Sequence, residues 1–134
     1  RVVIIGAHPM NNWQTTRISD KVNIIPEHEA CLMSASELVR IILAVLPDQP
    51  IYISVDKDVL DRANAATNWD QGSMTLQQLL DVIRELKRTR PITGADVCGE
   101  LPLSPVDFLS GEQVRHLKKN EIANKAIVDA LLAG

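Results

Sequence analysis

Short runs of hydrophobic residues recur along this chain, separated by segments in which hydrophobic residues follow a helical spacing. The runs occupy residues 2–5, 22–25, 51–55 and 92–97. Runs of this length without regular alternation are typical of strands that are buried on both faces of a parallel sheet. The pattern therefore predicts an α/β fold, with about four parallel strands in this chain.

Helices are predicted between and after these strands, over residues 36–46, 76–87 and 112–132. Each one follows a hydroxyl residue with Glu or Gln three positions later, which is a common signal of a helix start. The pairs are Ser34 and Glu37, Thr75 and Gln78, and Ser110 and Gln113. Pro47 and Pro91 end the first two helices. We expect the hydrophobic stripe of each helix to cover the sheet.

The composition is that of one globular domain, with 134 residues, 46% hydrophobic and 23% charged. A net charge of −3 provides no basic surface, which argues against a nucleic-acid partner. The longest hydrophobic runs are too short to cross a bilayer, so no membrane contact is expected. Cys31 and Cys98 have no CxxC spacing, which suits a reducing cytoplasm.

The chain opens with Arg1 instead of Met and enters a strand-like run at once. A parallel sheet of only four strands would also expose its edges unless more protein covered them. We therefore expect that a further segment belongs in front of residue 1.

The strand predicted at residues 51–55 runs into acidic residues. If the strand continues, Ser54, Asp56 and Asp58 share one side, with the two carboxylates about 7 Å apart. Carboxylates this close favour a hard divalent cation between them. Because parallel strands share their carboxyl ends, His8 and Glu100 should reach the same edge. A metal-binding edge is one interpretation, and a solvated strand end with an Asp-rich loop is the other.

Three motifs in this order resemble the carboxyl-terminal half of the arginase and agmatinase (ureohydrolase) family. They are SVDKDVLD, then QGSMT at the start of a helix, then GADVCGELP. The family pattern is Ser-x-Asp-x-Asp-x-x-Asp-Pro, a Thr- and Gly-rich loop, a glycine pair before a helix, and Asp-x-x-Glu-x-x-Pro. The order and spacing cover essentially the whole chain.

The resemblance implies a three-layer αβα fold of the arginase/deacetylase type, in a homo-oligomeric cytoplasmic enzyme. It makes Asp56 and Asp58 ligands of two Mn²⁺ ions, with Asp56 bridging them, and it gives Ser54 and Asp61 a role in supporting the loop. From the residues alone, Asp61 could instead cap the turn. The implied reaction is hydrolysis of a C–N bond in a small cationic guanidino or amidino substrate, with a metal-bridging hydroxide as the nucleophile.

The family's other ligands, a His after Gly-Gly and an Asp-x-His-x-Asp, belong to its amino-terminal half and do not occur here. Residues 1–134 are thus expected to form the carboxyl-terminal part of one arginase-like domain. We expect this part to bind metal poorly and to be inactive by itself.

The sequence departs from the pattern where substrate should bind. Arg62 replaces the proline, Gly72 and Ser73 replace the glycine pair, and the family's glutamate position holds Gly99. Glu100, one residue later, is our candidate for binding the cationic group during catalysis. If Glu100 does not do so, either Asp70 or a residue from the amino-terminal half would have to meet the substrate.

Three other side chains carry two interpretations each. His8 could transfer a proton to the leaving amine, or it could be a solvated loop residue. Trp13 and Trp69 could wall the substrate pocket and stack on a planar cation, or each could anchor its own loop. Lys57 should point away from Asp56 and form a neighbouring salt bridge.

Two other functions compete with this one. An Asp-x-Asp after a hydrophobic strand also occurs in haloacid-dehalogenase-type phosphatases and nucleotide-sugar transferases, but those need a phosphate-binding group that we do not find. Alternatively, the chain could be a ureohydrolase-like scaffold that has lost its metals and serves as an interaction module.

Overall fold

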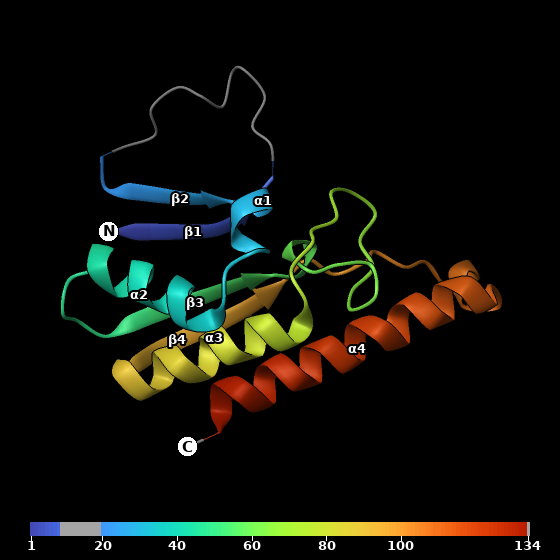
Figure 1. Ribbon diagram of the computed structural model, residues 1–134. Coiled ribbons are helices and arrows are strands. Elements are labelled where there is room, and N and C mark those ends of the chain that lie inside the picture. Colours follow the sequence, from blue (N-terminus) through green and yellow to red (C-terminus); the bar gives the residue numbers. More distant parts are fainter. Residues whose placement is uncertain (9–19, 134) are drawn as a thin grey trace.

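The computed structural model of the protein describes residues 1–8 and 20–133. It contains four strands in two parallel pairs, β1 with β2 and β3 with β4. Their bounds are Val2–Ala7, Val22–Pro26, Ile51–Asp56 and Ile92–Cys98. The parallel α/β fold and the position of every predicted strand are therefore confirmed (Figure 1).

The three predicted helices are present as α2, α3 and α4, with bounds Ala35–Val45, Leu76–Thr89 and Gly111–Leu132. Ser34 and Glu37 form a full capping box. Thr75 and Ser110 each accept a hydrogen bond from the backbone N–H three residues later. Three short elements were not predicted: α1 (Glu27–Ala30), and the 3-10 helices η2 (Lys57–Val59) and η3 (Pro105–Leu109).

The helices cover one face of the strands. Val3 and Ile5 of β1 and Ile53 of β3 pack into the core beneath α2 and α3, which lie side by side (Figure 1). The alternate residues Val2 and Tyr52 are exposed on the other face. Parallel sheets are normally covered on both faces, but residues 1–8 and 20–133 provide only one helical layer of the expected three-layer arrangement.

A gap separates the two strand pairs. A cavity of about 740 Å³ lies there, lined by residues 1–8 along β1 and 50–56 along β3. Hydrophobic residues of α2 and α3 form its floor, including Ile42, Leu79 and Val82. Within the described residues, β1 and β3 each pair with only one strand, so the edges that face this cavity lack a strand partner.

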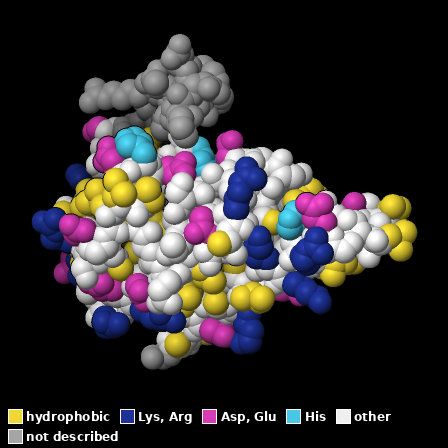
Figure 2. Space-filling view, turned by 45° about the vertical axis from the view of Figure 1, so that its right-hand side comes forward, with side chains coloured by type: hydrophobic (Ala, Val, Ile, Leu, Met, Phe, Trp, Pro, Cys, Tyr) yellow, Lys and Arg dark blue, Asp and Glu magenta, His cyan; other side chains and the backbone are white. Residues whose placement is uncertain are grey.

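Other hydrophobic side chains lie exposed at the end of the molecule where η3 meets α4. They include Val106, Phe108 and Leu109, and hydrophobic side chains are visible at that end in Figure 2. A hydrophobic group of this kind on a surface is typical of a contact with another protein. No helix in the described part of the chain has both the length and the hydrophobicity needed to cross a membrane.

Gly72 fixes the long loop that follows η2. Met74 N–H donates to the Val59 carbonyl oxygen at 3.1 Å, and Asp61 N–H donates to the Met74 carbonyl oxygen at 2.9 Å. These bonds bring the backbone of Gly72 so close that a Cβ atom there would lie 2.0 Å from the Val59 oxygen. Only glycine fits this approach, which holds residues 67–71 above the end of β3.

We expect Gly72→Ala to lower the free energy of unfolding by about 1–3 kcal/mol, because the added methyl group forces the two backbone segments apart. Urea unfolding with matched m-values measures this. Gly111→Ala is the control, since a Cβ atom at the start of α4 would meet only the end of the Arg115 side chain, at 3.7 Å. Equal stability of Gly72→Ala and the parent protein would contradict the close approach.

Candidate active site

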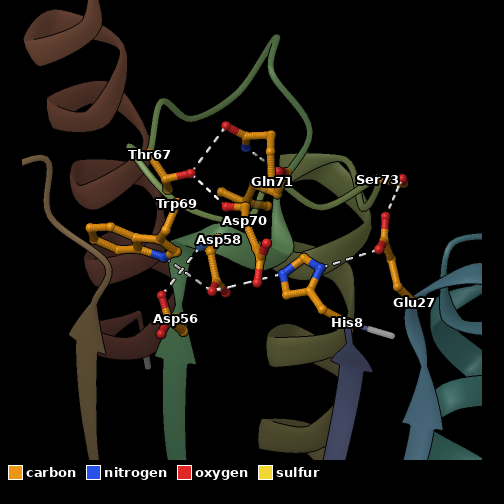
Figure 3. A network of polar contacts seen from close by, with 10 residues as sticks. His8, Glu27, Asp56, Asp58, Thr67, Trp69, Asp70, Gln71 and Ser73 are labelled. Carbon is orange, nitrogen blue, oxygen red and sulfur yellow. Dashed lines mark hydrogen bonds and ion pairs between the residues drawn. The ribbon is translucent and has the colours of Figure 1, made fainter. Parts of the chain in front are cut away.

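Strand β3 ends at Asp56, and the next three residues form η2. The expectation that an extended strand places Ser54, Asp56 and Asp58 on one side is therefore wrong beyond Asp56. The strand stops because the Asp56 carboxylate accepts a hydrogen bond from the backbone N–H of Asp58, at 3.3 Å, and so caps the turn. Asp58 nevertheless lies beside Asp56, because the turn folds it back over the end of the strand (Figure 3).

Asp58 is the centre of a polar network. Its Oδ2 accepts a hydrogen bond from Trp69 Nε1 at 3.2 Å and lies 3.8 Å from His8 Nε2 (Figure 3). Burial raises the pKa of Asp58, and the neighbouring charge of Asp56 raises it further. The charge of Asp70 acts in the same direction. This environment opposes a second negative charge and would favour a bound cation.

His8 follows β1. Its ring is contacted by Asp58 at Nε2 and by Glu27 at the other nitrogen, Nδ1. Its Nδ1 lies 3.2 Å from Oε2 of Glu27, whose Oε1 accepts a hydrogen bond from Ser73. His8 Nε2 is buried and has no hydrogen-bond partner among the described residues. Glu27 was not among the predicted site residues, although its place directly after β2, at the carboxyl end of a parallel strand, was the signal that could have found it.

The loop over the site carries Trp69 and Asp70. Thr67 Oγ1 donates to the Asp70 carbonyl oxygen at 2.6 Å, and Gln71 Nε2 donates to the Leu60 carbonyl oxygen at 2.5 Å. Trp69 is 47% exposed. The structure thus brings Trp69 and Asp70 to the aspartates, as the sequence predicts, while their roles toward a substrate stay a prediction. Trp13 lies outside the described residues.

Lys57 points away from the two aspartates, into the protein. It is 0% exposed, forms an ion pair with Glu100, and donates to Asn124 Oδ1 of α4 at 2.7 Å. The predicted salt bridge of Lys57 is therefore confirmed. Burial works against ionisation of Glu100, but the hydrogen bonds from Lys57 and Asn124 hold the pKa of Glu100 below its usual value. The predicted contact of Glu100 with substrate stays a prediction.

Ser54 and Asp61 have contacts that brace the site. Ser54 Oγ donates to Asp96 Oδ1 at 2.7 Å, and Tyr52 donates to Asp96 Oδ2 at 2.8 Å, which ties β3 to β4. Asp61 Oδ1 accepts from the backbone N–H of Asn64 at 3.0 Å, so it caps the turn that follows η2.

The donor set fits part of a metal site. Asp56 and Asp58 offer carboxylate oxygens, which suit Mn²⁺, and His8 Nε2 lies 3.8 Å from Asp58 Oδ2 beside them. Within the described residues, however, no three His, Cys, Asp or Glu side chains form a group that could hold a metal ion. A complete site would need ligands from beyond residues 1–8 and 20–133.

The chain is similar to known proteins in both sequence and fold. Residues 1–106 match the profile of the arginase family. An uncharacterized protein of Thermotoga maritima is 39% identical over 90 residues, which is 67% of this chain and 33% of that protein.

Two solved arginases are similar in structure. The arginase of Bacillus caldovelox has a TM-score of 0.74 and that of Bacillus subtilis has 0.76, each at 20% identity over 98% of this chain. The match takes in 42% and 44% of those two chains, respectively. The present chain therefore spans less than half of the arginases it matches and a third of the Thermotoga protein.

We expect Ser54→Ala to raise the pKa of Asp96, because the Ser54 hydrogen bond is the largest cause of its low value. Tyr52→Phe should raise this pKa less. Since the folded-state pKa lies below the usual 3.8, the hydrogen bonds stabilise the fold above that pH, and their contribution is lost as the pH falls further. Carboxyl carbon shifts followed by NMR against pH measure both changes, and an unchanged Asp96 titration in Ser54→Ala would contradict the contact.

Proposed function

Because the chain belongs to the arginase family, we propose that it forms the carboxyl-terminal part of a Mn²⁺-dependent hydrolase that cleaves a guanidino or amidino C–N bond. The observation that carries this proposal is the meeting of Asp56, Asp58 and His8 at the carboxyl ends of β1 and β3, although these two strands do not pair with each other.

Asp56 and Asp58 would hold the metal. Burial raises the pKa of Asp58 and the charge of Asp56 raises it further, and a cation would relieve the repulsion between the two carboxylates. When bound, two Mn²⁺ ions would supply Lewis acidity and a more acidic water, which a poor electrophile such as a guanidinium needs.

His8 is the proposed proton carrier. The contact between Nδ1 and Glu27 favours a proton on Nδ1, which leaves Nε2 free to accept a proton or donate one after it is protonated. Ser73 keeps Glu27 in place, so the ring has a fixed orientation toward Asp58. A fixed ring with one free nitrogen is suited to moving a proton to a leaving amine.

Trp69 and Asp70 are the proposed substrate contacts. The indole ring stands beside Asp58, where a planar cation could lie against it. Asp70 adds negative charge to the same surface, which favours a cationic group over a neutral one. Figure 2 shows acidic and histidine side chains on the surface turned forward in that view.

The rest of the domain is proposed to come from a segment in front of residue 1. Three features support this: the cavity between β1 and β3, the uncovered sheet face with Val2 and Tyr52, and the span of 42–44% of the matched arginases. An extended segment in the cavity would meet the edges of β1 and β3 that lack a strand partner among the described residues. The carboxyl end of such a strand would emerge beside His8 and Asp58, where further ligands are needed.

Self-association is also proposed. The hydrophobic side chains at η3, including Phe108 and Leu109, are the surface that best supports a contact between subunits. A cytoplasmic location stays a prediction.

We expect Asp56→Asn in the complete gene product to lower kcat/KM for guanidino substrates by about 10³-fold or more, because it removes a charged ligand of the metal. Asp58→Asn should act in the same way. Release of urea or amine from arginine and related guanidino compounds, together with Mn²⁺ content by elemental analysis, measures the effect. Asp48→Asn is the matched control, since Asp48 precedes β3 whereas Asp56 ends it, and the Asp48 side chain is 89% exposed beside Arg90.

Normal Mn²⁺ content and turnover in Asp56→Asn would show that the aspartates are only a solvated strand end. A parent protein that contains no Mn²⁺ would favour the scaffold function instead.

We also expect backbone amides along both edges of β3 to be protected from hydrogen exchange in the complete gene product. One set of alternate amides pairs with β4, and the other would pair with the proposed inserted strand. Exchange measured by NMR or mass spectrometry tests this. Protection limited to the β4 side would contradict the inserted strand.

A further inference from the structure

Lys57 stands between the two candidate ligands and is 0% exposed. A buried ammonium group without partners would cost a great deal of free energy. Here its partners come from two other parts of the fold: Glu100, after β4, and Asn124, on α4. Asn124 Nδ2 also donates to Glu100 Oε1 at 2.9 Å, which closes a triangle of three side chains.

The chain reaches Glu100 by crossing directly over Asp56. Gly99 has φ +82°, and a Cβ atom there would lie 2.3 Å from Asp56 Oδ1 and 2.8 Å from the Lys57 backbone nitrogen. The glutamate of the family pattern therefore has no room at position 99 in this backbone. The backbone at Gly99 is instead held in place by Glu100, whose carboxylate forms an ion pair with Lys57.

We propose that Lys57 is a positioning residue, and that Glu100 is its counter-ion and not a substrate contact. Because the Lys57 side chain is anchored in the interior, its neighbours Asp56 and Asp58 point outward. The ion pair with Glu100 also keeps the backbone of Gly99 close to Asp56. The inference rests on the proposed function only in taking the two aspartates as metal ligands.

Lys57 and Glu100 differ in solvent exposure, and this difference predicts which substitution lowers stability more. Lys57 is fully buried, whereas the Glu100 side chain is 56% exposed. Removing Glu100 leaves a buried ammonium with one neutral partner, but removing Lys57 leaves a carboxylate that water can reach. Loss of the carboxylate should therefore be the more damaging change.

The experiment is a double-mutant cycle on the complete gene product without metal. Urea unfolding measures the equilibrium constant of unfolding of each variant. Glu100→Gln should raise the equilibrium constant of unfolding about 30-fold or more, and Lys57→Met less than about fivefold. The double variant should resemble Lys57→Met, because no ammonium is then left unpaired. Lys125→Met is the matched control, since Lys125 pairs with Asp129 on the same helix but is 77% exposed.

A second measurement separates positioning from stability alone. Trp69 Nε1 donates to Asp58, so the indole N–H signal in an NMR spectrum reports where Asp58 lies. In fully folded Lys57→Met this signal, identified through its loss in Trp69→Phe, should shift, while in Lys125→Met it should stay in place.

The inference is overturned if Glu100→Gln unfolds like the parent, if the double variant shows additive losses, or if the indole signal does not move in Lys57→Met. None of these measurements uses metal or turnover. Failure of the proposed function would instead be seen as a parent protein without Mn²⁺-dependent hydrolysis.

Discussion

The complete burial of Lys57 is the constraint on which the candidate site depends. Strand β3 ends at Asp56, and the turn that follows must send one side chain into the interior. Because that side chain carries an ammonium group, the fold must bring Glu100 and Asn124 to it. The aspartates on either side of it are then left at the surface of the sheet edge, where Trp69 and His8 reach Asp58.

The rest of the architecture fits a domain that is larger than the described residues. Helices cover one face of the strands, and the two strand pairs leave a cavity between them. The core among α2, α3, α4 and the strands is nevertheless well formed, with Leu38, Leu60, Ile83 and Ile127 almost fully buried. The site lies where the cavity opens at the carboxyl ends of β1 and β3, so the proposed missing strand and the proposed missing ligands belong to the same place.

Much of this could be predicted from the sequence. Hydrophobic runs located all four strands, and hydroxyl caps with helical spacing located the three long helices, because both signals are local. The rule that parallel strands share their carboxyl ends brought His8 to the aspartates. The burial of Lys57 and the identity of its partners could not be predicted, because those partners lie 43 and 67 positions away along the chain.

Two side-chain contacts were missed. Glu27 contacts His8 from the end of β2, and its place directly after that strand was the one signal in the sequence that could have found it. The backbone N–H of Gln78 donates to Thr75 Oγ1, as the helix-start signal implies, but its side chain donates to the carbonyl oxygens of Ala30 and Met33 at 2.9 and 2.6 Å. Both contacts join segments that are separate in the sequence, so a local pattern does not reveal them.

The most direct test of the central claim is X-ray diffraction from crystals of the complete gene product grown with Mn²⁺, with data collected at the manganese absorption edge. We expect anomalous density beside the carboxylates of Asp56 and Asp58, with the Lys57 side chain turned away from them toward Glu100. Two results would contradict this expectation. One is manganese bound elsewhere in the protein, and the other is a structure without manganese at the ends of β1 and β3 in which Asp56 and Asp58 point into solvent.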